Sequence, residues 1–219
     1  MRAMDFYHLI NRGVEKRNVF MEDGDYIRFI HNMYVFNDSG SAPNYYVKER
    51  TIERKRDMLL YIHAFALMPN HYHILASPLK EGGVSLFMRK LNMGYAKYFN
   101  EKYERTGVLW QGTFRKVLIE RNEHFIHIPY YIHLNPLDLV DAGWREGTIE
   151  NSNDALNYLR KYRWSSYLDY NGVRNFPSVL RMLELGPILG PQRTQDGEIR
   201  SLIADPYSPS KNSYLFEMD

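Results

Sequence analysis

The sequence predicts an α+β fold, in which four antiparallel strands carry helices on one face of the sheet and a C-terminal helical extension follows. Three observations lead to this prediction. Short apolar segments typical of strands alternate with longer segments whose apolar residues recur at helical spacing. Glycine, proline and asparagine stand at the junctions between them. A chain of 219 residues with 44% hydrophobic residues is also long and apolar enough for a buried core.

The first two elements are a strand and a helix. Residues 6–12 form an apolar run typical of a strand. An apolar stripe over residues 26–34 predicts a helix, for which Asp23 or Asp25 could serve as the N-cap. A turn-rich segment ends this helix, and we expect an insert over about residues 37–58.

A hairpin, a long helix and a fourth strand follow. Residues 59–67 and 71–77 read as two strands joined by a tight connection. Gly82 precedes a helix whose apolar positions continue to Phe99, and residues 113–120 read as the last strand. The order β-α-β-β-α-β predicts the split βαβ, or ferredoxin-like, arrangement.

The C-terminal part of the chain is expected to be helical. A last core helix should run through Tyr131 and end before Pro136, because a proline disfavours helical geometry in the residue that precedes it. We divide the chain into a main domain over residues 1–140 and an extension over residues 141–219. Beyond Gly190 the composition is polar, which predicts a loosely packed tail.

Composition limits the functional classes. The chain contains no cysteine, which excludes disulfides, cysteine-based zinc sites and thiol nucleophiles. It shows neither a signal-peptide apolar region nor a run of about 18 apolar residues. We therefore expect a soluble cytoplasmic protein with no membrane partner.

The basic residues gather in a few places although the net charge is only +2. Charge alone favours a solvated surface for such clusters, and phosphate contact is the alternative. The candidate DNA-binding residues are Arg12, Lys16, Arg17, Arg54, Lys55, Arg56, Arg89 and Lys90.

Two histidines are the first candidate site residues. His71 and His73 stand two apart in an apolar run, so on a strand they share one face of the sheet. Two imidazoles on one face are a ready pair of ligands for a divalent metal ion. The alternative is a pair of histidines that make ordinary hydrogen bonds.

A tyrosine and an asparagine form the second candidate pair. Tyr131 and Asn135 are four residues apart, so they share a face of the predicted helix. Pro129 would remove one hydrogen bond of that helix and bend it. Because the chain has 18 tyrosines, ordinary packing remains the alternative for Tyr131.

Five segments in this order resemble the single-tyrosine HUH transposases, and most closely the REP-associated tyrosine transposases. The matching segments are Tyr7-His8-Leu9-Ile10-Asn11-Arg12-Gly13, Met68-Pro69-Asn70-His71-Tyr72-His73, Leu109-Trp110-Gln111-Gly112-Thr113-Phe114, Tyr131-Ile132-His133-Leu134-Asn135-Pro136 and Trp164-Ser165-Ser166-Tyr167. The chain departs from the family pattern after Pro136, where the stretch up to Trp144 is longer and lacks the usual arginine.

The resemblance implies a metal-assisted DNA strand transferase. It implies that His71, His73 and Asn135 bind a divalent metal ion, Mg²⁺ or Mn²⁺, and that Tyr131 is the nucleophile that forms a 5′-phosphotyrosine. The implied partner is single-stranded or hairpin DNA, with no small-molecule cofactor, and a homodimer is allowed. Two alternatives stay open: a catalytically silent nucleic-acid-binding module, and a metal-dependent phosphodiesterase that forms no covalent intermediate.

Overall fold

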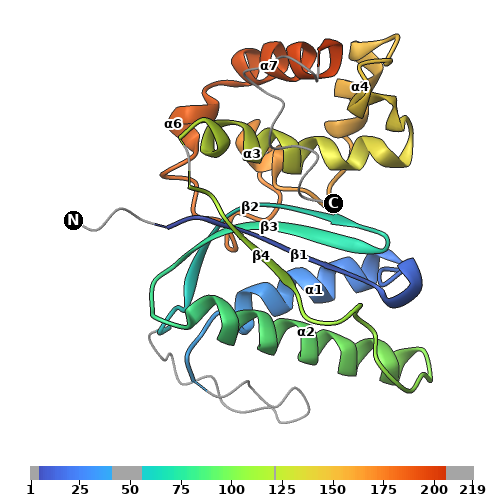
Figure 1. Cartoon of the computed structure of the whole chain (residues 1–219), viewed down its shortest axis with the longest axis vertical. Helices are drawn as coiled ribbons and strands as arrows, with labels where there is room; N and C mark the ends of the chain where they lie inside the picture. The colour runs from blue at the N-terminus through green and yellow to red at the C-terminus, as the bar shows by residue number, and fades with distance from the viewer. Residues whose placement is uncertain (1–4, 41–55, 121, 206–219) are drawn as a thin grey trace.

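A four-stranded antiparallel sheet lies at the centre of the molecule (Figure 1). The computed structural model describes residues 5–40, 56–120 and 122–205. The strand order is β2-β3-β1-β4, and the first and fourth strands lie side by side. The strands are β1 (Tyr7–Arg12), β2 (Leu60–Met68), β3 (His71–Pro78) and β4 (Arg115–Leu118). This order confirms the predicted α+β, ferredoxin-like class.

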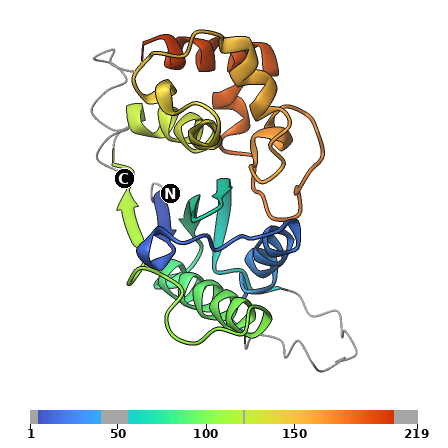
Figure 2. The same cartoon turned by 90° about the vertical axis from the view of Figure 1, so that its right-hand side faces the viewer.

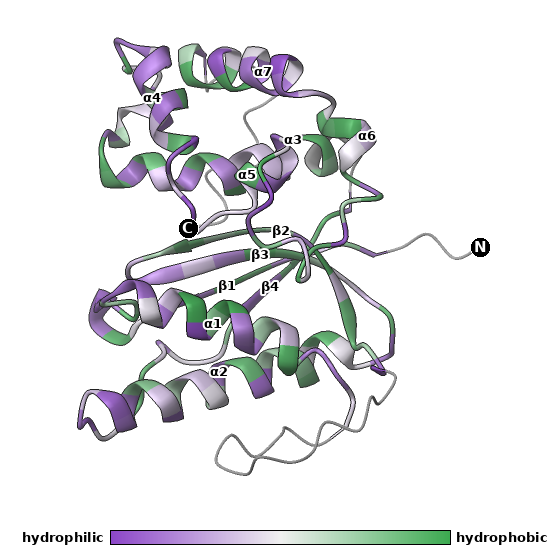
Figure 3. Ribbon diagram, turned by 180° about the vertical axis from the view of Figure 1, so that it is seen from behind, coloured by the Kyte–Doolittle hydropathy of each residue, from purple (hydrophilic) through white to green (hydrophobic). Residues whose placement is uncertain are grey.

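Helices α1 (Asp23–Val35) and α2 (Gly83–Lys102) cover one face of the sheet (Figures 1 and 2). The core on this side includes Leu9, Tyr72 and Ile74, which alternate with residues of the opposite face as strand geometry requires. Figure 3 shows that α1 and α2 are striped with apolar and polar residues, which fits helices packed on a sheet by one side only.

The start of α1 corrects one expectation. The N-cap is Glu22, rather than Asp23 or Asp25. Glu22 accepts from the third helical residue, while the Asp25 side chain accepts from the Glu22 backbone, so the two form a capping box. Two donors that a helix start leaves without partners are satisfied in this way.

The opposite face of the sheet is also covered, a layer that the sequence did not place. Helix α3 (Asn122–Leu134) lies against β2 and β3, where Ala64, Ala66 and Leu75 form its contact surface. The two alanines leave room for a helix to approach the sheet closely. The other helices of this layer are α4 (Ser152–Leu159), α5 (Tyr167–Tyr170), α6 (Gly186–Leu189) and α7 (Gln192–Ala204) (Figure 1).

Three short 3₁₀ helices complete the described secondary structure. They are η1 (Val14–Lys16), which follows β1, and η2 (Asn135–Leu139) and η3 (Ala142–Arg145), which follow α3. Helix α3 ends at Leu134 and Pro136 lies in η2, as expected for a helix that stops before a proline. Within the described ranges, no helix combines the length and apolarity needed to cross a membrane.

The prediction of a loosely packed tail beyond Gly190 is wrong for the part that the structure describes. Helix α7 buries Ile199, Leu202 and Ile203 in the same core as α3. The Gln195 amide also donates to the Gly190 carbonyl at 2.9 Å. The overall polarity of the segment hid an amphipathic helix. Residues 206–219 lie outside the described residues.

Hydrogen bonds join the extension to β2. Leu67 donates to the Trp164 carbonyl at 2.9 Å, and Ser166 Oγ accepts from the Phe65 amide at 2.9 Å. The segment around Ser165 therefore lies along the outer edge of β2. This joins the extension to the sheet, while the division of the chain at residue 140 stays a prediction.

Candidate active site

The two predicted histidines lie on β3, on the face that α3 covers. His73 is opposite Ile10 of β1 and Ala66 of β2, and His71 is opposite Arg12. The two imidazole rings are 5.0 Å apart between centroids, and both side chains are buried. Strand alternation thus brings the pair together as predicted.

His73 is held by another histidine, His8 of β1. His8 Nε2 lies 2.9 Å from His73 Nδ1, and the two rings are stacked. Burial, with a smaller effect of the Arg115 charge, lowers the pKa of His8 to about 3, and burial lowers the pKa of His73 strongly as well. Both rings are therefore neutral near pH 7, and one donates to the other.

The second nitrogen of His73 is available to a ligand. His73 Nε2 is buried and has no hydrogen-bond partner among the described residues. A buried nitrogen without a partner is costly unless something binds it. If Nδ1 donates to His8, Nε2 carries the lone pair that a metal ion requires, which is the usual second-shell arrangement of a ligating histidine.

His71 is oriented in a similar way. Its Nδ1 lies 2.6 Å from Asn70 Oδ1, and Asn70 Nδ2 donates to the Lys16 carbonyl at 3.2 Å. The second bond fixes the orientation of the amide, so His71 Nδ1 carries a proton. In the neutral ring, the lone pair then lies on Nε2.

Tyr131 lies beside the histidine pair in the same chain. Its ring, carried by α3, stands edge-on to His73 at 5.7 Å and to His8 at 6.0 Å between centroids. The side chain has an exposed fraction of 0%. Residues from β1, β3 and α3 therefore meet in one buried cluster.

Asn135 is tied to Tyr131 at the end of α3. Its Nδ2 donates to the Tyr131 carbonyl at 2.8 Å, one turn back, and its Oδ1 accepts from Arg145 Nη2 at 3.1 Å. A carbonyl oxygen has two lone pairs, so Oδ1 can accept this bond and still offer a second pair.

Arg145 of η3 is a site residue that the sequence did not reveal. Its Nη1 lies 3.5 Å from Tyr131 Oη, and its Nη2 forms a 2.8 Å ion pair with Asp138. Its guanidinium also stacks on the Trp144 ring at 4.6 Å. Burial acts to lower the pKa of Arg145, but Asp138 and Tyr131 outweigh it and hold the pKa above its ordinary value.

The missed residues differ in the signal that they left. His8 belongs to a segment that resembles the family, so its position next to His71 and His73 could have been suspected. Arg145 comes ten residues after Asn135, beyond a stretch that lacked the expected arginine. Only the fold shows that the longer connection after Pro136 returns Arg145 to Tyr131.

A divalent metal fits these residues in one arrangement. Within the described part of the chain, no three His, Asp or Glu side chains gather as a metal-binding group. The Asn135 amide oxygen stays the predicted third ligand. The buried His73 Nε2 without a partner is the observation that favours a ligand at this place.

Two neighbours of Tyr131 are ordinary core residues. Tyr130 is buried, with its hydroxyl 3.5 Å from the Leu189 carbonyl. His133 Nε2 lies 2.8 Å from Ser166 Oγ, and burial lowers its pKa to about 3. Their contacts lie with the helical extension.

The predicted DNA-binding residues that the structure describes lie in two separate regions. Arg12 lies at the active site, since its charge helps to lower the pKa of His73. Lys16 and Arg17 lie at and just after η1, next to the β2–β3 hairpin. Arg54 and Lys55 lie outside the described residues.

The remaining three predicted cations lie on the α1–α2 side. Arg56 donates to the Tyr34 carbonyl at 2.5 Å and stacks on its ring, and Lys90 donates to the Asp38 carbonyl at 2.5 Å. These two cations therefore have structural contacts. Arg89 is exposed on α2.

Comparisons with known proteins identify the family of this chain. No curated protein sequence matches the chain. One solved structure, a REP-associated tyrosine transposase bound to a REP hairpin, is similar with a TM-score of 0.49 and 15% identity, over 78% of this chain and 83% of that one. The family model of IS200-like transposases matches residues 6–135, which span every predicted site residue. The chain therefore belongs to the family of IS200-like transposases.

Proposed function

We propose that this transposase cleaves and rejoins single-stranded or hairpin DNA through a 5′-phosphotyrosine on Tyr131. The observation that carries the proposal is the contact of Tyr131 with His73, whose Nε2 is buried without a partner. A nucleophile and a site for a phosphate-binding cation thus lie side by side in one chain.

The chemical step is an in-line displacement at phosphorus. Tyr131 Oη loses its phenolic proton and attacks the scissile phosphate, a bond from Oη to phosphorus forms, and the bond from phosphorus to the 3′ oxygen breaks. The leaving 3′ oxygen takes up a proton and becomes a hydroxyl. Because the phosphodiester energy is kept in the tyrosine ester, a later 3′-hydroxyl can reverse the step and join strands.

His71, His73 and Asn135 would hold the divalent ion, Mg²⁺ or Mn²⁺. Such an ion supplies Lewis-acid polarisation of a phosphoryl oxygen and a template for the phosphate. His8 Nε2 would accept from the Nδ1–H of His73 and so keep the ring in the ligating tautomer. Asn70 does the same for His71.

Arg145 supplies positive charge at the nucleophile. A free phenol titrates near pH 10, so the phenolate needs stabilisation at neutral pH. The guanidinium at 3.5 Å from Tyr131 Oη favours the phenolate and, after attack, the charge that develops at the phosphate. Asp138 holds that guanidinium in place through its ion pair.

DNA can reach Tyr131 only if some of the residues that bury it move. The tyrosine is fully buried, and Trp144 and Arg145 of η3 lie against its ring. We propose that η3 shifts when DNA binds and that the tyrosine acts within its own chain. A homodimer is compatible with this arrangement but is not required by it.

The test is covalent trapping. The full chain is incubated with single-stranded DNA that carries a flanking hairpin, with Mn²⁺ or Mg²⁺, and the products are run under denaturing conditions. We expect a denaturant-stable protein–DNA adduct that Tyr131→Phe abolishes and the matched variant Tyr130→Phe retains.

Other outcomes would contradict the proposal. Cleavage without an adduct would identify a metal-dependent phosphodiesterase in which water attacks. Salt-sensitive binding without cleavage would identify a catalytically silent module. An adduct that survives Tyr131→Phe but not Tyr130→Phe would move the nucleophile to Tyr130.

A further inference from the structure

We propose that a groove between α2 and residues 107–114 binds one unpaired base of the DNA substrate. The inference rests on the proposed function and adds the place at which the DNA is read. The groove has a volume of about 730 Å³, a normal size for a ligand site. It lies on the α2 side of the sheet, whereas the Tyr131 site lies on the α3 side.

The walls of the groove are apolar on both sides. Helix α2 contributes Met88 and Met93. The segment of residues 107–114, called the groove segment below, contributes Val108 and the aromatic rings of Trp110 and Phe114. Val108 is 72% exposed and Met93 is 68% exposed, although both are apolar. Exposed apolar side chains around a hollow are typical of a binding site, and rings next to thioethers suit the flat faces of a base.

The floor of the groove offers polar groups for the edge of a base. Asn11 lies there, nine-tenths buried, and its Nδ2 makes no hydrogen bond of normal geometry within the described part of the chain. The adjacent Tyr72 hydroxyl, which interacts with the Asn11 amide, donates to Asn92 Oδ1 at 2.6 Å. A ring nitrogen or carbonyl of a base could accept from Asn11 Nδ2, which makes the groove more than a hydrophobic patch.

Charge at the rim favours a nucleotide over an apolar peptide. Arg89 lines the groove and is exposed. Cations beside an aromatic pocket match a base with its phosphate backbone. An apolar peptide would offer the Arg89 charge no counterpart.

The groove is adjacent to the catalytic cluster across the end of β1. Asn11 faces the groove, and its neighbour Arg12 is opposite His71 on the other face. The Gln111 backbone donates to the Arg12 carbonyl at 2.8 Å, which brings the groove segment to the same strand end. A DNA strand that leaves the phosphate at His71 can pass this end of β1 and place a flanking base in the groove.

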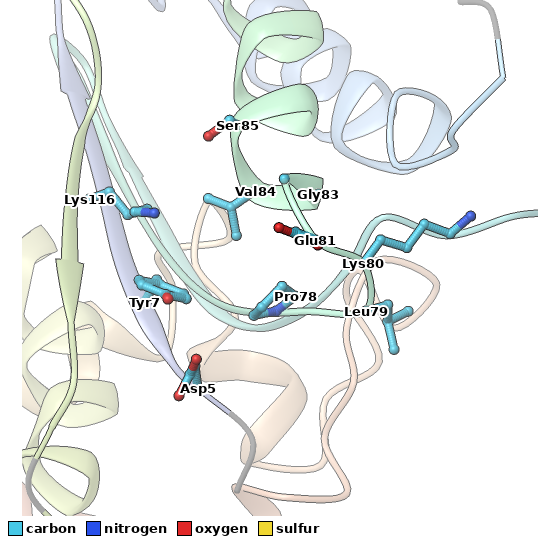
Figure 4. A pocket seen from close by; sticks show the side chains of 11 residues that line it. Asp5, Tyr7, Pro78, Leu79, Lys80, Glu81, Gly83, Val84, Ser85 and Lys116 are labelled. Atoms are coloured by element: carbon cyan, nitrogen blue, oxygen red, sulfur yellow. The ribbon is translucent and has the colours of Figure 1, made fainter. Parts of the chain in front are cut away.

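A second hollow of about 700 Å³ is less suited to a base. It lies at the opposite end of β1, between Tyr7, Lys116 and the start of α2 (Figure 4). The Lys116 ammonium lies 4.7 Å from the centre of the Tyr7 ring, over one face of the only aromatic side chain that lines it. A base has no second flat partner there.

The test places the fluorescent base 2-aminopurine in turn at each position that flanks the cleavage site in single-stranded DNA. With the unaltered full chain, we expect one position to change its fluorescence on binding. Val108→Ala combined with Met93→Ala should remove that change and weaken binding roughly tenfold. Arg89→Gln should weaken binding less, and the exposed control Lys97→Gln on the same helix should leave both unchanged.

The outcomes separate the groove from the chemistry. If the adduct on Tyr131 forms but the groove variants bind every labelled DNA like the unaltered chain, the groove inference alone fails. If the labelled base responds to the groove variants but no adduct ever forms, the proposed function alone fails. If light scattering shows that the double variant turns a dimer into a monomer, the groove is a self-association surface and the inference is overturned.

Discussion

His8 and His73 share a 2.9 Å hydrogen bond between two neutral, buried imidazoles on adjacent strands. Neither ring can turn without breaking this bond, so His73 Nε2 keeps one direction, towards the site beside Tyr131. Such second-shell bonds decide how well a histidine binds metal.

His8→Ala should therefore reduce function through the metal. We expect the rate of adduct formation at low Mn²⁺ to fall by about 10- to 100-fold, with partial recovery at high Mn²⁺. The measurement is a Mn²⁺ titration of adduct formation, with His31→Ala, an exposed position on α1, as the control. An unchanged Mn²⁺ requirement in a folded His8→Ala chain would refute this role.

Arg145 should affect the chemical step more than DNA binding. Removing its charge with Arg145→Gln is expected to slow adduct formation by about 100-fold or more, a typical effect of losing one stabilising donor. Arg145→Lys should recover only part of the rate, because an ammonium lacks the fork that bonds Asn135 and Asp138 together.

The readout for Arg145 is the single-turnover adduct rate at saturating DNA, next to the dissociation constant of the same DNA. The exposed Arg193 of α7 offers a matched control, Arg193→Gln, which should change neither quantity. An Arg145→Gln chain that keeps the rate but binds DNA tenfold more weakly would make Arg145 a DNA contact instead.

Asp25 should be a main source of stability on the α1–α2 side. Its buried carboxylate accepts from Lys102 at 2.7 Å, Tyr103 at 2.7 Å and Tyr98 at 2.9 Å. Burial acts to raise the pKa of Asp25, but these bonds, led by that from Lys102, and one from the Met21 backbone hold it below its ordinary value. The carboxylate therefore stabilises the fold above the unfolded pKa, and this stability is lost as pH falls through the lower folded value.

Asp25→Asn is expected to lower the free energy of unfolding by about 2 to 3 kcal/mol at pH 7, because charged hydrogen bonds to a buried acceptor are lost. The measurement is urea denaturation followed by circular dichroism. Asp23→Asn, an exposed change in the same helical turn, should cost well under 1 kcal/mol. Equal losses for the two variants would contradict the prediction.

His63 should make the fold sensitive to mild acid. Its Nε2 lies 2.7 Å from Ser77 Oγ and its Nδ1 lies 3.1 Å from the Arg181 carbonyl. Burial lowers its pKa to about 4, despite the nearby Glu184 carboxylate, from an ordinary value near 6.5. Between these two pH values the unfolded chain binds a proton that the folded chain excludes, so stability is complete above pH 6.5 and falls as pH drops towards 4.

The loss attributable to His63 is about 3 kcal/mol across that interval, from the size of the pKa shift. Urea denaturation at pH 7, 6, 5 and 4 measures it. Gln does not titrate, so the stability of the His63→Gln chain should fall less steeply with decreasing pH than that of the unaltered chain. The two chains share all other titrating groups, so the difference between them belongs to His63. Parallel curves for the two chains would show that His63 is not responsible.

The sheet and its two crossover helices were predictable because their signals are local. Alternation placed His71 and His73 on one face, and helical spacing placed Tyr131 and Asn135 on another. That the two pairs meet was inferred from the family resemblance, since nothing in the spacing fixes how α3 crosses the sheet. Ala64 and Ala66 decide that packing, and small residues in an apolar strand gave no warning of a second helical layer.

Arg145 and α7 show where reading the sequence fails. The arginine reaches Tyr131 through two 3₁₀ helices, whose path depends on Trp144 and Asp138 rather than on any periodic pattern. Helix α7 is polar overall, and only the burial of Ile199 and Leu202 against the core reveals its inner face. Tertiary contacts set both features, and they override local composition.

The catalytic cluster also imposes an order on synthesis. It joins residue 8 to residues 73, 131 and 145, so the cluster is complete only after about two thirds of the chain has been made. Contacts so distant in sequence form late and slowly. Helix α3 further shares its core with α6 and α7, so the tyrosine is not fixed until almost the whole chain has left the ribosome. If Tyr131 acts as proposed, we expect a nascent chain to form no adduct until its C-terminal helices have folded.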